Sequence, residues 1–68
     1  MATSRALGLS EREAEVLFWI SEGKSSPENA LIIGAAAATV KKHAENLFAK
    51  LGVENRAAAT RLALEKLR

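Results

Sequence analysis

The sequence predicts an all-α domain of four helices. Apolar residues recur at three- and four-residue spacing in four separate segments, which is the period of an amphipathic helix. Serine, glycine and proline fall between these segments, at positions typical of helix starts and ends. No segment alternates with a period of two, as a half-buried strand does. We expect helices at about 11–22, 27–33, 36–51 and 55–67, after a flexible lead or linker remnant at 1–8.

Length and composition limit the possible classes of protein. The 68 residues suffice for one small domain, placed here at 9–68, and no cysteine is present to add disulfides or a thiolate metal site. No apolar run approaches the roughly 20 residues that span a bilayer. The N-terminus also lacks the apolar segment of a secretory signal. We therefore expect a cytoplasmic domain with no membrane contact, no metal or other cofactor and no small-molecule ligand.

The first two helices are marked by their ends. Ser10 and Glu13 form a capping-box pattern that starts the first helix, and Gly23 ends it. Pro27 suits the first position of the second helix, after a serine cap, and Gly34 ends that helix. The inward-facing residues of the second helix are expected to be Ala30 and Ile33, with Leu31 or Ile32 filling in.

The third segment has two distinct faces. One is an apolar stripe of Val40, Ala44, Leu47 and Leu51. The other repeats the same spacing about a third of a turn away with Ala38, Lys41, Lys42, Glu45 and Ala49. A helix held down by one stripe, with paired lysines and small residues outside, can enter a DNA groove. A short helix and a glycine turn precede it, which is the helix-turn-helix layout.

The fourth segment, capped by Asn55, carries two stripes. Ala59, Leu62 and Ala63 suit packing on the domain, and a second side carries Ala57, Thr60, Leu64 and Leu67. Because one stripe is enough for docking, the second is a candidate dimer face. The alternative is that its leucines are surface residues of a terminal helix.

Charge is divided unevenly along the chain. Residues 1–40 carry three basic and five acidic side chains, a net charge of −2, whereas residues 41–68 carry seven and three, a net charge of +4. The positive half contains the candidate recognition helix, which favours a nucleic-acid partner. The alternative is a face that is basic for solubility alone.

Several spaced motifs occur together: Leu9-Ser10-x-Arg12-Glu13-x-Glu15-Val16-Leu17, Gly23-Lys24-Ser25, Glu28, Ala30, Thr39-Val40-Lys41-x-His43, Lys50-Leu51-Gly52-Val53 and Asn55-Arg56. Over about residues 9–66 the chain thereby resembles the LuxR-type (GerE-like) DNA-binding domain of bacterial transcription regulators. The resemblance implies a four-helix domain whose second and third helices form the helix-turn-helix. It also implies an output domain without catalysis that binds operator DNA as a weak dimer through its fourth helix, with RNA polymerase as a candidate contact.

The resemblance places the third helix in the major groove and assigns base contacts to Lys41, Lys42 and Glu45. Lysine can donate to guanine O6 and N7, and a glutamate can accept from cytosine N4. Glu45 has an alternative role, which is to orient Lys41 or Lys42 at helical spacing.

Phosphate contacts are assigned to residues at helix starts and beside the recognition helix: Lys24, Ser25, Ser26, Thr39, His43, Lys50 and Arg56. Each group has a structural alternative. The serines can simply cap, and His43 can be packed structure. Asn55 can cap while Arg56 pairs with Glu15 or another glutamate.

The run from Ala35 to Ala38 departs from the family pattern, which commonly has serine at the start of the recognition helix. Alanine cannot cap a helix, so we expect this start to lack its side-chain acceptor. Two other functions stay open: a protein-interaction module with weak or lost DNA binding, and a sigma-factor-like promoter-recognition domain. An enzyme is not expected, because no nucleophile–base pair or phosphate-cradling glycine loop is present.

Overall fold

A computed structural model describes residues 8–66, and within this range the chain forms four helices and no strand. The helices are α2 (Glu11–Ser21), α3 (Ser26–Ile33), α4 (Ala37–Leu51) and α5 (Arg56–Lys66). The predicted all-α class is confirmed, and the predicted helix ends agree with these within one residue. Except for Gly8, the lead predicted at 1–8 lies outside the described residues.

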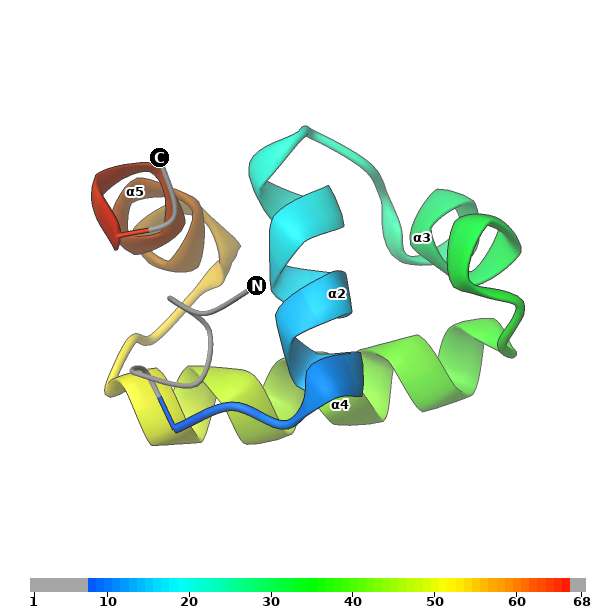
Figure 1. Cartoon of the computed structure of the whole chain (residues 1–68), viewed down its shortest axis with the longest axis horizontal. Coiled ribbons are helices and arrows are strands. Elements are labelled where there is room, and N and C mark those ends of the chain that lie inside the picture. Colours follow the sequence, from blue (N-terminus) through cyan, green and yellow to red (C-terminus); the bar gives the residue numbers. More distant parts are fainter. Residues whose placement is uncertain (1–7, 67–68) are drawn as a thin grey trace.

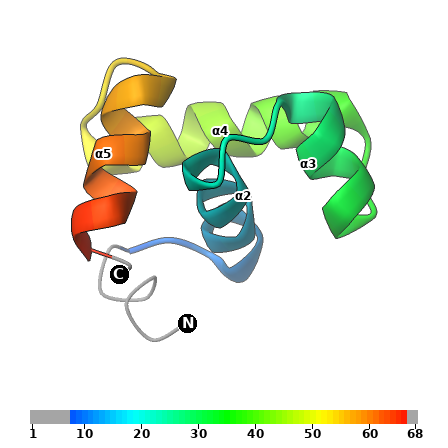
Figure 2. The ribbon, with the colours of Figure 1, turned by 90° about the horizontal axis from the view of Figure 1, so that it is seen from above.

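The helices are arranged around α4, which lies along the length of the molecule (Figure 1). α2 crosses the middle of α4, while α3 lies beside its start and α5 beside its end, an arrangement that Figure 2 shows from above. α2 contacts all three other helices. α2 therefore supports the α3–α4 pair, which forms the helix-turn-helix.

The core forms where the inner faces of these helices meet. α2 contributes Val16, Leu17 and Ile20, and α4 contributes Val40 and Leu47, which are all 3% exposed or less. α5 contributes the small residues Ala59 and Ala63, both fully buried, which confirms these two members of its predicted packing stripe. The third member, Leu62, is half-buried. The predicted stripe of α4 is confirmed too, since Ala44 and Leu51 are half-buried against this core.

The helix ends follow the local chemistry of the sequence. Ser10 and Glu13 form the predicted capping box, and a second box joins Ser25 and Glu28. Pro27 therefore occupies the second helical position and not the first. Gly34 ends α3 in the left-handed conformation (φ 71°), where a side chain would be strained.

α3 differs from the prediction in what it buries. Leu31 is 84% exposed and Ile32 is 44% exposed, so neither fills the core, and that expectation was wrong. Asn29 is buried instead, with 1% of its surface exposed. The cause is the sequence of α3, whose apolar residues are nearly continuous and do not select one inward face.

Candidate nucleic-acid interface

The outer face of α4 presents the charged row that the sequence placed there. Lys41, Lys42 and Glu45 are exposed, as are the small residues Ala38 and Ala49 in the same row. Val40 and Leu47 hold the opposite side of the helix in the core. Because the apolar side is fully used for packing, the charged row is the side of α4 that remains accessible to a partner.

The start of α4 has no side-chain cap. Ala36 occupies the cap position with extended backbone (φ −78°, ψ 150°), and no side chain accepts from the first-turn N–H groups. The predicted absence of a cap is therefore confirmed. Ala38 and Thr39 are exposed in this first turn of α4. Thr39 has the only side-chain hydroxyl in the turn.

The start of α3 is polar and firmly capped. The backbone N–H of Ser25 donates to Glu28 Oε1 at 2.9 Å, and the backbone N–H of Glu28 donates to Ser25 Oγ at 3.4 Å. The hydrogen bond from the Ser25 backbone, followed by that from the Ser25 side chain, holds the pKa of Glu28 below its ordinary value, helped by the charges of Lys24 and Arg56. The Ser25 hydroxyl thus caps the helix, as the structural alternative foresaw, and Lys24 and Ser26 lie half-buried beside it.

A shallow hollow brings the starts of α3 and α5 to the side of α4. Its volume is about 250 Å³, and its apolar lining comes from Ile20, Ala44 and Phe48. Ser26, Lys41, Glu45 and Arg56 supply its polar lining. Four predicted site residues from three helices therefore lie around one depression.

The ion pairs differ from those considered from the sequence. Within residues 8–66, no ion pair within 4.0 Å joins Glu45 to Lys41 or Lys42. Asn55 caps α5 as expected, accepting from the Ala58 N–H at 2.9 Å. Arg56 was interpreted as a possible partner of Glu15 or of another glutamate, and the pairing with Glu15 is wrong, because Glu15 lies 3.6 Å from Arg12 instead.

The side chain of Lys50 is engaged in an ion pair. Its Nζ lies 2.7 Å from Oε1 of Glu13, whose side chain is only 6% exposed. The hydrogen bond from Lys50, followed by that from the Ser10 backbone, holds the pKa of Glu13 below its ordinary value of 4.5. This pair spans 37 residues of sequence. No local pattern could have predicted it.

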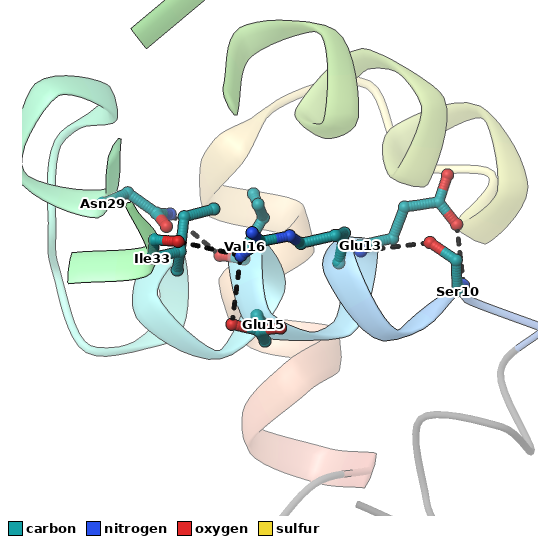
Figure 3. Close-up of polar contacts among 7 residues, drawn as sticks. Ser10, Glu13, Glu15, Val16, Asn29 and Ile33 are labelled. Atoms are coloured by element: carbon teal, nitrogen blue, oxygen red, sulfur yellow. Dashed lines mark hydrogen bonds and ion pairs between the residues drawn. The ribbon is translucent and has the colours of Figure 1, made fainter. Parts of the chain in front are cut away.

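Two further contacts to α3 were also missed. Arg12 Nη1 donates to the Ile33 carbonyl at 2.9 Å, and Asn29 Nδ2 donates to the Val16 carbonyl at 3.1 Å (Figure 3). Neither Arg12 nor Asn29 was predicted from the sequence to make such a contact or to belong to the site. The sequence offered no distinct signal for Asn29, because Ser26 and Glu28 of the same helix are polar too.

The predicted dimer face of α5 is partly open. Ala57 is exposed, Thr60 is half-buried, and Leu64 is 43% exposed. Leu67, its fourth member, lies outside the described residues. His43, predicted to contact phosphate or to be packed structure, is half-buried on α4.

Other classes of site are absent from the part of the chain that the structure describes. Over residues 8–66, no helix is long and apolar enough to cross a membrane. The same range holds no group of three or more His, Cys, Asp or Glu side chains that could bind a metal ion.

Comparison with known proteins identifies the family. Residues 7–63 match the family described as "Bacterial regulatory proteins, luxR family" (GerE). The chain is 54% identical over 57 residues to the transcriptional activator protein YukR of Yersinia ruckeri, an alignment that covers 84% of this chain and 25% of YukR.

Two other transcriptional activators are similar. EsaR of Pantoea stewartii subsp. stewartii is 50% identical over 56 residues, which is 82% of this chain and 22% of EsaR. PhzR of Pseudomonas fluorescens is 42% identical over 55 residues, which is 81% of this chain and 22% of PhzR. The chain thus spans about a quarter of the length of the curated relatives it matches. No solved structure matches it at a significant level.

The match covers most of the chain and includes all of α2, α3 and α4. The family is one of transcription regulators and not of enzymes. The chain belongs to the LuxR family of bacterial regulatory proteins and carries its helix-turn-helix domain.

Proposed function

We propose that this LuxR-family DNA-binding domain reads double-stranded DNA by placing α4 in the major groove, as the output domain of a bacterial transcription regulator. One observation carries the proposal: Lys41, Lys42 and Glu45 form an exposed row directly outside a helix whose other side is buried. A helix mounted in this way can be inserted into a groove without exposing the core.

The chemistry of this row suits base edges. Lys41 and Lys42 can donate to O6 and N7 of guanine, and the carboxylate of Glu45 can accept from N4 of cytosine. Because no ion pair engages Glu45 with either lysine within residues 8–66, its carboxylate is available as an acceptor. The row would therefore favour G·C pairs at the centre of each half-site.

Phosphates would be met at the edges of α4. Ser26 and Arg56 lie around the same hollow as Lys41, and Lys24 and Ser25 adjoin Ser26. Thr39 in the first turn and His43 beside the row complete this set. Such contacts set the register of the domain on DNA and make its affinity strongly dependent on salt.

Dimerisation would use α5. Ala57, Thr60 and Leu64 offer a small, partly apolar surface away from the buried Ala59 and Ala63. Two copies on a two-fold site would place their recognition helices about 34 Å apart, one turn of DNA. The small area of this face supports a weak homodimer that forms on the operator.

The test is selection from a random duplex library at low and moderate salt. The chain is compared with the double variant Lys41→Ala/Lys42→Ala and with Lys66→Ala, which removes an exposed lysine from α5. Enrichment of a two-fold-related motif by the chain and by the control, but not by the double variant, is the expected result. Equal enrichment by all three proteins would remove α4 from the recognition role.

A protein-interaction module is the second candidate, and the exposed Leu31 favours it. An exposed leucine next to Ile32 on one short helix is a common feature of protein contacts. For a folded chain, no DNA binding even at low salt, together with a concentration-dependent protein contact, would favour this function. The other alternative, a sigma-factor domain, is not the family that matches.

A further inference from the structure

Two consecutive residues at the start of α2 reach the C-terminal ends of both helices of the helix-turn-helix. Arg12 donates to the carbonyl of Ile33, the last residue of α3, at 2.9 Å. Glu13 binds Lys50, the last residue but one of α4, at 2.7 Å. In Figure 3, Ile33 lies to the left of Val16 of α2 and the Glu13 carboxylate lies to its right. One turn of α2 therefore holds two helices from two sides.

The two contacts differ in their surroundings. The Glu13 carboxylate is buried, with 6% of its side chain exposed, whereas the Lys50 side chain is 46% exposed, so water screens their attraction in part. Arg12 is half-exposed, but Glu15 lies 3.6 Å from its guanidinium on the same helix and helps to orient it. The Arg12 donor is thus oriented by Glu15, and the Glu13 acceptor is oriented by the backbone N–H of Ser10, which donates to it at 2.9 Å.

Apolar packing defines the orientation of α3 only weakly. Only Asn29 and Ala30 of its eight residues are fully buried, Ile33 is half-buried against the core, and Leu31 and Ile32 are exposed. Short helices are normally oriented by the apolar face that they bury. In α3 this face is small, so polar contacts at defined atoms add to the definition of its rotation and tilt.

We propose that Arg12 and Glu13 are positioning residues that set the angle between α3 and α4, and through that angle the fit of α4 to DNA. The proposal rests on the proposed function for its effect on DNA, but the angle itself can be measured without DNA. Lys50 belongs to this arrangement as the partner of Glu13, and not to the set of phosphate contacts.

The experiment combines two measurements on the complete chain. Residual dipolar couplings of backbone N–H vectors give the relative orientation of α3 and α4 in solution. Fluorescence anisotropy at several salt concentrations gives the affinity for a duplex selected from the random library and the slope of log Kd against log salt. The variants are Arg12→Met, Glu13→Gln and Lys50→Met. Gln at position 13 can still accept from Ser10 and keeps the helix cap.

A matched control comes from the same turn of α2. Glu11→Gln removes an exposed carboxylate that takes no part in the contacts of Arg12 with Ile33 or of Glu13 with Lys50. We expect the three variants to change the α3–α4 orientation and to weaken DNA binding about tenfold, the loss of roughly one base contact. We expect the control to do neither.

The salt slope separates positioning from direct contact. A lysine that binds phosphate reduces the slope by about one when it is removed. An unchanged slope in Lys50→Met therefore supports the proposal, whereas a reduced slope in that variant overturns the assignment of Lys50. An unchanged orientation in the folded variants overturns the proposal whatever the DNA result. If the unaltered chain binds no DNA, the proposed function fails, and the couplings still decide whether these residues set the angle.

Discussion

Asn29 in α3 donates its side-chain amide to the carbonyl of Val16 in the middle of α2, at 3.1 Å. The Oδ1 atom of the same side chain is buried and accepts no hydrogen bond from any group within residues 8–66. A buried acceptor without a partner costs about 1–3 kcal/mol, which is comparable to or larger than the net contribution of one hydrogen bond. Asn29 therefore joins two helices at a position where its own burial is unfavourable.

Replacing this residue should stabilise the domain. Asn29→Leu keeps the approximate volume of the side chain and removes the unsatisfied oxygen, so we expect the free energy of unfolding in urea to rise by about 1 kcal/mol. Asn46→Leu, at an exposed position of α4, should leave it unchanged. A clear loss of stability in Asn29→Leu would show that the hydrogen bond to Val16 outweighs the cost of the unpaired oxygen.

Restoring a cap should also stabilise the domain. Ala36 already has the extended backbone of a cap residue, so Ala36→Ser can accept from the first-turn N–H groups without rearrangement. We expect a gain of about 1 kcal/mol in thermal or urea unfolding. Ala38→Ser, at the second residue of α4, is the matched control and should give no gain. Equal effects at both positions would mean that the start of α4 needs no side-chain acceptor.

Acid should reveal the contribution of Glu13. Its pKa is lower in the folded chain than its ordinary value of 4.5, so its carboxylate stabilises the fold above about that pH. This stabilisation is lost as the pH falls through the lowered pKa. Glu13→Gln has no such group, so its deficit in unfolding free energy at pH 7 should shrink at about pH 3. A deficit that stays constant with pH would show that packing, and not charge, causes it. Glu11→Gln should show no deficit at either pH.

Two leucines with the same chemical change should behave in opposite ways. Leu31→Ala removes a side chain that is 84% exposed, and we expect a change in unfolding free energy below about 0.5 kcal/mol. Leu47→Ala empties a fully buried position and should cost about 2–5 kcal/mol, enough to unfold much of a small domain. Circular dichroism during urea titration measures both. A large loss in Leu31→Ala would indicate that α3 packs differently in solution.

Much of the fold could be predicted because its signals are local. The Ser10–Glu13 capping box, the left-handed Gly34 and the stripe through Val40 and Leu47 each depend on residues within a few positions of one another. Such patterns give helix ends and helix faces directly. The exposed row of Lys41, Lys42 and Glu45 follows from the same stripe, since it lies on the face that the stripe leaves outside.

The contacts that hold the helices together could not be predicted in this way. Arg12 meets the Ile33 carbonyl 21 residues away, and Glu13 meets Lys50 across 37 residues. Each contact depends on the packing of whole helices, which no local spacing encodes. The prediction for α3 was wrong for a different reason. Its consecutive apolar residues gave the helical period no contrast, so Leu31 or Ile32 was expected to face inward, and the burial of Asn29 was not predicted.

One atom, Oε1 of Glu13, accepts both the Ser10 N–H at 2.9 Å and the Lys50 ammonium at 2.7 Å. We therefore expect the opening of the first turn of α2 and of the last turn of α4 to be coupled, because fraying at either place removes a partner from the same oxygen. In native-state hydrogen exchange, the amide of Ser10 should report the opening of a unit that includes the end of α4. The start of α2 is thus linked, through one shared acceptor atom, to the end of the helix that we propose reads DNA.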